Sequence, residues 1–402
     1  MSSKLLTLPD ELLIAILRML DRDLPTLRSV ALVSHRLLPA AREELFRIVD
    51  ADILKFPSMR PFLVHVEEIC LIARERLITF DLDELFLSAA HPRPDPQSMP
   101  KFRAIHLLGY QGTAVCTEHH QELAALPLLR SVRELSLYNV LLSGMHELCL
   151  FPNLQRLAIS MVYFITESPS RPASVARLLA DNANQPRLVQ LRMGEQIPSR
   201  NPVPELARWL LQGPSRDTLK TLIASFRSRE TQGLLSHFGP TIEHLALPLR
   251  ELHNTVYNGY LGRYANLRTL CVFLGSYNMV PGAWYLLPSL LTHMPTTYLQ
   301  TLTIDIRLDY PLPQISSAIQ IHWKTLDRVN DALDEDKFSA LREVEVVVQW
   351  KERLGWEPEK TQTDVIAQNM RERLYHMEDA GKLAVTVQGV KEFWDSVPGP
   401  KG

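Results

Sequence analysis

The chain has 402 residues, of which 46% are hydrophobic and 22% charged, and its formal net charge is −2. This apolar content suffices for a buried core and excludes disorder as the overall state, while the length suits roughly two to three domains or one repeat array. The near-zero charge lacks the surplus of Lys and Arg that nucleic-acid-binding proteins carry, so we expect no nucleic-acid partner.

The first fifty residues predict three short amphipathic helices. Pro9 suits a first helical turn, and Asp10 and Glu11 complement the positive end of the helix dipole. Apolar residues then recur at the helical period as far as residue 20, and two further helices follow. A unit this small buries little surface, so we expect it to be either a helical cap on the rest of the chain or a unit that a partner covers.

The motifs of this segment resemble an F-box. They are Leu8-Pro9-Asp10-Glu11, the Ile16-Leu17 pair, the Leu20-Asp21 turn, and Val33-Ser34 followed by His35-Arg36, although Leu37 stands where many F-boxes carry Trp. The resemblance implies a three-helix F-box-like domain at residues 1–50. It also implies docking to the Skp-type adaptor of an SCF-type cullin–RING ubiquitin ligase. The adaptor-binding candidates that it implies are Leu8, Pro9, Leu12, Ile16, Leu17, Leu24, Leu27, Val30 and Val33.

From about residue 64 onward one pattern recurs: an apolar residue, two mostly polar ones, an apolar one, any residue, and an apolar one. It occurs ten times, and its central apolar residues lie roughly 31 residues apart on average. The last two apolar positions alternate with a polar one, which is typical of a half-buried strand. Such recurrence favours a repeat array. The central residues are Ile69, Ile105, Leu135, Leu157, Leu191, Leu222, Leu245, Leu270, Leu302 and Val344.

Segments between these copies predict helices, namely Val203–Leu211, Ala283–His293, Ile315–Leu333 and Thr363–Glu378. Proline-rich segments predict loops, namely His91–Pro96, Phe164–Pro172 and Ser199–Pro204. The alternation resembles the irregular leucine-rich repeats of many F-box proteins, which implies an α/β solenoid (a horseshoe) with parallel strands. We expect 51–304 to form this array, and 305–402 to form atypical C-terminal repeats and a cap, with a last strand at Leu383–Val387.

Residues suited to catalysis or metal binding do not form a recognisable motif. The sequence contains no P-loop, GxGxxG, HExxH or GxSxG. Cys116-Thr117-Glu118-His119-His120 lacks a second Cys/His pair, so we favour a surface loop over a metal site. Cys271 lies on a predicted strand, which favours a small buried hydrophobe over a nucleophile paired with a distant histidine. We therefore expect no metal, no cofactor and a non-catalytic chain, with an unrecognised enzyme site as the least favoured alternative.

The cysteine usage and the hydropathy predict where the protein resides. Four cysteines are too few for a disulfide framework in a chain of this length, which indicates a reducing intracellular compartment, cytoplasmic or nuclear. No stretch reaches the roughly 18–20 apolar residues of a membrane helix, and the apolar start is interrupted too early for an export signal. We expect no membrane partner.

The polar positions of the predicted strands favour a binding function. In a horseshoe they face the concave surface, although ordinary solvated side chains would fit as well. Basic residues dominate the middle of the array, which favours an acidic ligand there, whereas Glu343 and Glu345 follow in the last copy. We expect a substrate receptor of an SCF-type ligase, with a ligase-independent repeat scaffold as the alternative. The target-binding candidates are Arg133, Arg156, Arg192, Lys220, His244 and Arg268.

Overall fold

The computed structural model describes the strands, helices and turns of two compact units. The first unit comprises Met1–Arg187 with Gln196–Pro202, and the second comprises Leu188–Glu195 with Val203–Gly402. The predicted domain boundaries at residues 50 and 304 remain predictions. The described residues are 12, 17, 26, 29, 38, 41, 48–50, 66–72, 79–82, 86, 102–116, 123, 126–142, 144–164, 185–194, 203–224, 234–235, 237–249, 263–275, 285–294, 298–308, 323–334, 336–351 and 360–390.

The first unit contains a parallel sheet with short connecting helices. In spatial order its strands are β1 (Ile48–Asp50), β2 (Glu68–Ile72), β4 (Ala104–Cys116), β5 (Glu134–Leu142) and β6 (Arg156–Ser160). Two short strands pair alongside, β3 (Thr79–Asp81) with β4 and β7 (Tyr163–Phe164) with β5. The helices of this unit whose bounds are described are α6 (Pro127–Arg130) and the 3-10 turn η4 (Met145–Leu150).

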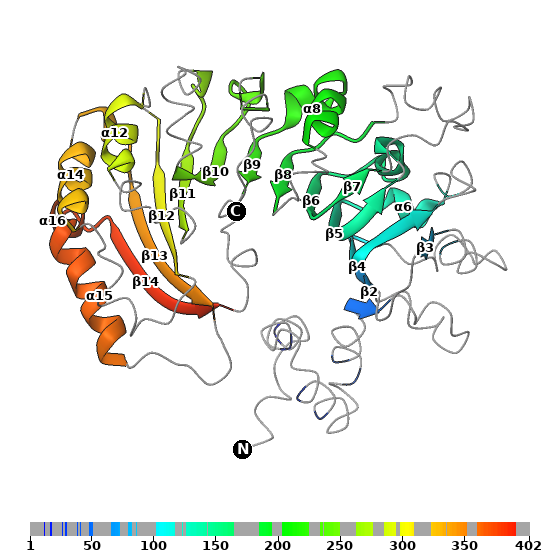
Figure 1. Ribbon diagram of the computed structural model, residues 1–402, viewed down its shortest axis with the longest axis horizontal. Helices are drawn as coiled ribbons and strands as arrows, with labels where there is room; N and C mark the ends of the chain where they lie inside the picture. Colours follow the sequence, from blue (N-terminus) through cyan, green and yellow to red (C-terminus); the bar gives the residue numbers. More distant parts are fainter. Residues whose placement is uncertain are drawn as a thin grey trace. The chain divides into compact units, whose positions relative to one another are not determined.

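The second unit contains a longer parallel sheet with its strands in chain order (Figure 1). Its strands are β8 (Gln190–Met193), β9 (Thr221–Ala224), β10 (His244–Pro248), β11 (Thr269–Gly275), β12 (Thr301–Leu308), β13 (Glu343–Lys351) and β14 (Leu383–Val390). Its helices whose bounds are described are α8 (Val203–Gln212), α9 (Ser215–Thr218), α12 (Leu286–His293), α14 (Trp323–Leu333), η9 (Asp336–Phe338), α15 (Lys360–Arg373) and α16 (Tyr375–Asp379). The chain is thus an α/β protein with repeat-like parallel strands.

One face of each sheet consists of the central apolar residues of the repeats, and we call it the leucine face. In the second unit the set pairs in register across β9–β13, and each member is at most 1% exposed. Burying one such side chain contributes about 1.5–3 kcal/mol, so this row is the main source of cohesion between neighbouring repeats. The set is Leu222, Leu245, Leu270, Leu302 and Val344. Its counterpart in the first unit is Ile69, Ile105, Leu135 and Leu157.

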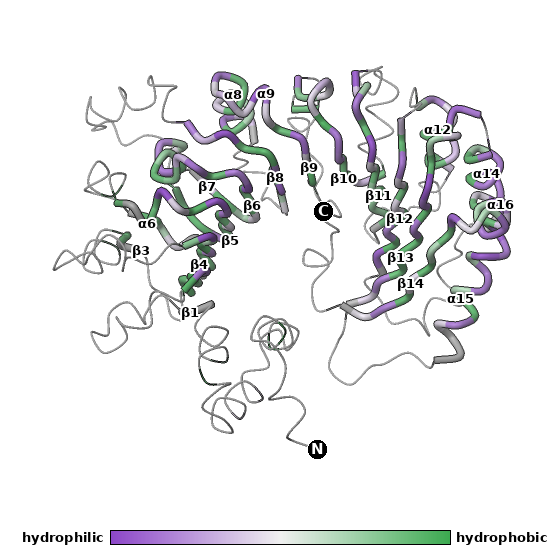
Figure 2. The backbone as a smooth tube through the Cα atoms, turned by 180° about the vertical axis from the view of Figure 1, so that it is seen from behind, coloured by the Kyte–Doolittle hydropathy of each residue, from purple (hydrophilic) through white to green (hydrophobic). Residues whose placement is uncertain are grey.

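Helices of the second unit cover its leucine face. Val385 and Val387 of β14 share that face because they pair with Val346 and Val348 of β13, and both lie against α15. Figure 1 shows α12, α14 and α15 on the same side of strands β11–β14. Successive residues of a strand point alternately to the leucine face and to the opposite face. Along β12 apolar and polar residues therefore alternate, and the hydropathy changes accordingly along this strand in Figure 2.

Most of the predicted elements are confirmed. The ten predicted strands all exist, because β2, β4, β5, β6 and β8–β13 each contain the central residue of one copy of the pattern. The predicted helices appear as α8, α12, α14, α15 and α16, and the predicted last strand appears as β14.

The loop predictions need two corrections. The loop predicted over Ser199–Pro204 ends early, because α8 begins at Val203 and a proline fits within its first turn. The loop predicted from Phe164 begins one residue too soon, because Phe164 ends β7. The predicted loop at His91–Pro96 lies outside the described residues, as do 165–172 and 199–202.

Hydrogen bonds between consecutive repeats align the residues just before the strands. The backbone N–H of Glu243 donates to the carbonyl of Lys220, that of Arg268 to Glu243, and that of Gln300 to Arg268, each at 2.8 Å. Equivalent bonds join Glu67, Arg103 and Arg133 in the first unit. These positions therefore stack in a row at the strand entrances, where their side chains are neighbours.

Candidate functional site

The face opposite the leucine face in the second unit carries two rows of side chains, which we call the polar face. Strand register places the members of each row side by side, about 4.8 Å apart between strands. Period-two alternation explains why these residues leave the leucine face. The first row is Thr221, His244, Thr269, Thr301 and Glu343. The second row is Ile223, Ala246, Cys271, Thr303 and Glu345.

A pocket of about 330 Å³ lies on this polar face. Ile223, Ala246 and Cys271 contribute apolar lining and are only 2–4% exposed. Ala246 and Cys271 have short side chains, which leave space above the strands. Polar side chains of both rows complete the lining, together with Glu243, Arg268 and Gln300 from the strand entrances.

The strand-entrance side of the pocket carries an alternating charge row. Lys220 Nζ donates to Glu243 Oε1 at 2.7 Å. The hydrogen bond from Lys220 holds the pKa of Glu243 below its ordinary value, with further contributions from the charges of Lys220, Arg268 and His244. Arg268 is exposed and makes no side-chain hydrogen bond or ion pair with another described residue. This side of the pocket is therefore of mixed charge, with Glu243 between two cations.

His244 is a neutral hydrogen-bonding group in the pocket wall. Burial lowers the pKa of its imidazole, and the charges of Arg268 and Lys220 lower it further against the opposing effect of Glu243. Its Nδ1 is buried and finds no hydrogen-bond partner within the described part of the chain. At neutral pH it can therefore donate or accept one further hydrogen bond.

Glu345 forms the acidic end of the pocket. It is half-buried and accepts a hydrogen bond from Thr303 Oγ1 at 3.3 Å. No cationic side chain among the described residues pairs with it. Its carboxylate therefore keeps capacity for a further donor.

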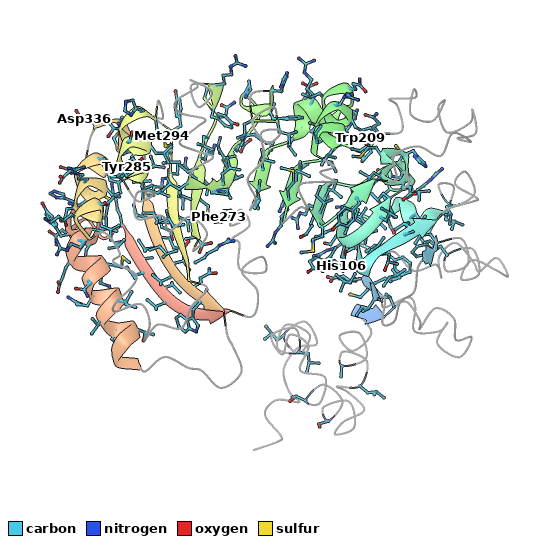
Figure 3. All side chains as sticks on the ribbon, in the orientation of Figure 1. His106, Trp209, Phe273, Tyr285, Met294 and Asp336 are labelled. Atoms are coloured by element: carbon cyan, nitrogen blue, oxygen red, sulfur yellow. The ribbon has the colours of Figure 1, made fainter. Side chains whose placement is uncertain are left out.

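A buried charge pair lies beyond the pocket on the same face. Arg307 donates from Nε to Asp305 Oδ2 at 2.9 Å, and its Nη2 is 2.8 Å from the same oxygen. The guanidinium lies over the ring of Phe273, a residue labelled in Figure 3, with 4.0 Å between Cζ and the ring centre. Burial raises the pKa of Asp305 even though Arg307 opposes the shift.

Cys271 is not an activated nucleophile. It is 3% exposed on β11, so the prediction of a small buried hydrophobe is confirmed. Burial first, and then the charge of Asp305, raise the pKa of its thiol well above the ordinary value. The thiol stays protonated at neutral pH, and the thiolate is the form that reacts. The pocket is suited to binding by hydrogen bonds and charge.

The structure brings together half of the predicted target-binding residues. His244 and Arg268 line the pocket, and Lys220 bonds to its wall through Glu243. Arg192 lies on β8 in register with Ile223, at the far end of the second row. The remaining two belong to the first unit: Arg133 precedes β5, and Arg156 begins β6, where its Nη1 lies 3.6 Å from Glu134.

Several pocket residues were not among the predicted candidates. Thr221 and Thr269 of the first row and the apolar residues of the second were overlooked because the prediction selected basic residues. Glu243 was overlooked although it directly precedes a strand, as Arg268 does. The signal was available in the strand register, since residues at equal positions in successive copies become neighbours.

The predicted adaptor-binding residues are described at two positions. Leu12 and Leu17 are both helical, with Leu12 50% exposed and Leu17 5% exposed. The other candidates, Leu8, Pro9, Ile16, Leu24, Leu27, Val30 and Val33, lie outside the described residues. One predicted contact residue is thus available to a partner and another is not.

The Cys116–His120 cluster is described only at Cys116, which ends β4. Within the described ranges, no group of three or more His, Cys, Asp or Glu is arranged to hold a metal ion. No helix in those ranges is long and apolar enough to cross a membrane.

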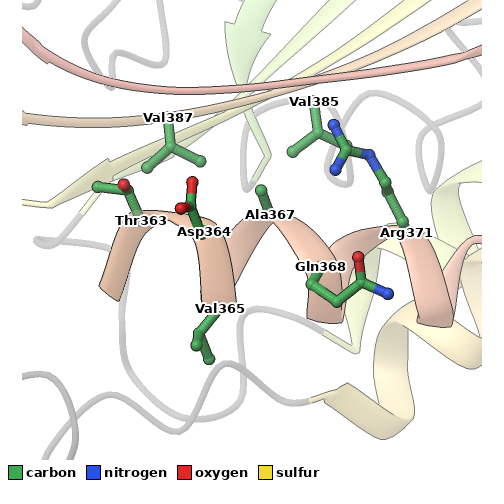
Figure 4. Close-up of a pocket in the computed structure, with 8 residues that line it drawn as sticks. All are labelled: Thr363, Asp364, Val365, Ala367, Gln368, Arg371, Val385 and Val387. Atoms are coloured by element: carbon green, nitrogen blue, oxygen red, sulfur yellow. The ribbon is translucent and has the colours of Figure 1, made fainter. Parts of the chain in front are cut away.

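A second hollow, of about 570 Å³, lies between α15 and β14 (Figure 4). Thr363, Asp364 and Arg371 point from the helix toward Val385 and Val387 of the strand. These valines are half-buried, whereas Val346 and Val348 on the neighbouring strand are fully buried. The hollow is thus an incompletely covered part of the leucine face at the last strand.

Comparison with known proteins places the chain in no family. No family model matches its sequence, and no curated protein matches it either.

Proposed function

We propose that this chain is the substrate-recognition subunit of an SCF-type cullin–RING ubiquitin ligase. Its N-terminal helices would bind the Skp-type adaptor, and its repeats would form a leucine-rich-repeat-like solenoid that binds a target protein inside the cell. The observation that carries the target-binding role is the pocket on the polar face, bordered by Glu243, Arg268 and Glu345. Its walls are positioned by strands whose other face is a continuous core.

The adaptor-binding role is supported by the F-box-like motifs and by Leu12. An apolar helical residue that is 50% exposed fits an amphipathic helix that binds a groove of a partner. Leu17 is buried, so it fits a role in packing the helices against each other. In this proposal the chain contributes proximity, because it holds the target near the ubiquitin-carrying enzyme of the complex.

The test is a pull-down of the full chain with a purified Skp-type adaptor, comparing the wild type with Leu12→Asp. The control is Val365→Asp, because Val365 is also an exposed apolar residue, 59% exposed on α15. We expect the wild type and the control to bind the adaptor, and Leu12→Asp to bind at least about tenfold more weakly because a charge would be buried in an apolar groove. Absence of binding by a folded wild-type chain would contradict the ligase role and favour a ligase-independent scaffold.

A further inference from the structure

The floor of the polar-face pocket suits the stem of a long side chain. Ile223, Ala246 and Cys271 give it an apolar surface along one row of strands. A volume of about 330 Å³ is at the small end of ligand pockets and accommodates one or two side chains. Long basic side chains lay their methylene groups on apolar surface while their charged ends reach a polar partner.

The acidic end of this pocket lacks a counter-ion. Glu345 is half-buried, so it has lost part of its hydration, and its single described hydrogen bond is the 3.3 Å contact with Thr303. Arg268, at the other end, is exposed and therefore hydrated. A partly desolvated charge without a counter-ion costs more free energy than a solvated one. An ion pair with a ligand would therefore gain more at Glu345 than at Arg268.

The neighbouring charges also favour a cation beside Glu345. Arg307 donates one hydrogen bond from Nε to Asp305, forms an ion pair with the same oxygen and stacks on Phe273, so it is directed to a carboxylate other than Glu345. On β12 and β13, the three carboxylates Asp305, Glu343 and Glu345 outnumber the two cations Arg307 and Lys351. Glu243, nearer Arg268, already has Lys220 as its partner. The field at the Glu345 end of the pocket therefore favours a positive group.

We infer that the pocket binds a lysine or arginine side chain of an extended target segment, with its charged end on Glu345 and its stem over Ala246 and Cys271. This inference rests on the proposed target-binding function and narrows its ligand class. It differs from the acidic ligand that the basic residues of the middle repeats favoured, because Lys220 is neutralised by Glu243 and Arg268 is hydrated.

The test uses the full-length chain and a positional-scanning library of short synthetic peptides, each with one fixed residue. We expect the wild type to favour Lys or Arg at one position, by about tenfold over the uncharged norleucine, as is typical of a hydrogen bond to a charged group. Glu345→Gln keeps the size of the side chain and its bond to Thr303 but removes the charge, so the preference should disappear. Glu372→Gln is the matched control, because Glu372 is an exposed carboxylate on α15 that bonds to Gln368.

Each outcome of this test has a distinct meaning. Peptides that bind with no basic preference, or with the same preference in Glu345→Gln, overturn the inference and leave the target-binding function in place. A wild-type chain that retains no peptide from the library overturns the inference and the role of the polar face together. If the chain prefers basic peptides but does not bind the adaptor in the pull-down, the inference stands and only the ligase role is contradicted.

Discussion

The faces opposite the leucine face differ between the two units, although the two leucine faces are alike. In the first unit this face carries two close polar contacts between neighbouring strands: His106 Nε2 lies 3.6 Å from Glu68 Oε2, and Arg156 Nη1 lies 3.6 Å from Glu134 Oε2. In the second unit Glu345 has no cationic partner among the described residues and borders a pocket. The leucine pattern therefore specifies the strands but not the residues of the opposite face, so the binding properties of that face can vary at little cost to the fold.

The largest expected effect separates the two faces of one strand. Leu270 is fully buried on the leucine face of β11, and Thr269, the preceding residue, is half-buried on the polar face. We expect Leu270→Ala to lower the free energy of unfolding by about 2–5 kcal/mol because it leaves a cavity. Thr269→Ala should change it by about 0.5 kcal/mol or less. Urea denaturation measures both, and similar losses for the two variants would contradict the division of roles between the faces.

The next effect concerns an irregularity of the first unit. The pairing of β4 with β5 shifts between Leu108 and Thr113, and Asn139 opposite has a left-handed φ of 54°. A Cβ at Gly109 would overlap the backbone oxygen of Asn139. We therefore expect Gly109→Ala to lower the free energy of unfolding by about 1–3 kcal/mol.

Gly381→Ala is the control for this prediction. Gly381 has a φ of 65°, but nothing lies near its would-be Cβ, so only the conformational strain applies. Its cost should be about 1 kcal/mol. Thermal unfolding compares the stability of the two variants. An unchanged stability of Gly109→Ala would show that β4 and β5 separate at Gly109 more easily than the Cβ overlap implies.

The smallest effect is the pH dependence of the Lys220–Glu243 pair. The lowered pKa of Glu243 means that its contribution to stability is present above the ordinary value of 4.5 and is lost as the pH falls through the folded-state pKa. The pair is solvent-exposed in part, so the contribution should be about 0.2–1 kcal/mol. We expect the difference in melting temperature between the wild type and Lys220→Met to be largest above pH 4.5 and to shrink as the pH falls below it. A difference that does not depend on pH would assign the effect to packing of the lysine stem.

The strands could be predicted from the sequence because each depends on a local signal. One apolar pattern identified all ten, whereas the contact that the Asn of an Asn-Leu pair makes with the preceding repeat was not predicted. Asn266 donates from Nδ2 to the carbonyl of Pro240, and Asn153 donates in the same way to Arg130. By contrast, the shift at Gly109 depends on the backbone conformation of Asn139 on another strand, which no local pattern encodes.

The candidate site could be predicted only in part. The pattern placed His244 on a strand, as the structure does, but it also placed Arg268 on a strand, whereas Arg268 precedes β11. It could not show that Lys220 is paired with Glu243 or that Glu345 is left without a cation among the described residues. Those facts depend on strand register and on which side chains reach one another across several repeats. The basic residues counted along the sequence therefore favoured an acidic ligand. The pairing of charges in the structure favours a basic one.

Target recognition by the polar face can be tested with a charge-reversal cycle at Glu345. It combines the wild type and Glu345→Lys with two versions of the peptide that the library selects, one with its basic residue and one with glutamate there. We predict that Glu345→Lys weakens binding of the basic peptide at least about tenfold and restores binding of the glutamate peptide. Equal affinity of both protein variants for the basic peptide would contradict the central claim that this face of the second unit recognises the target.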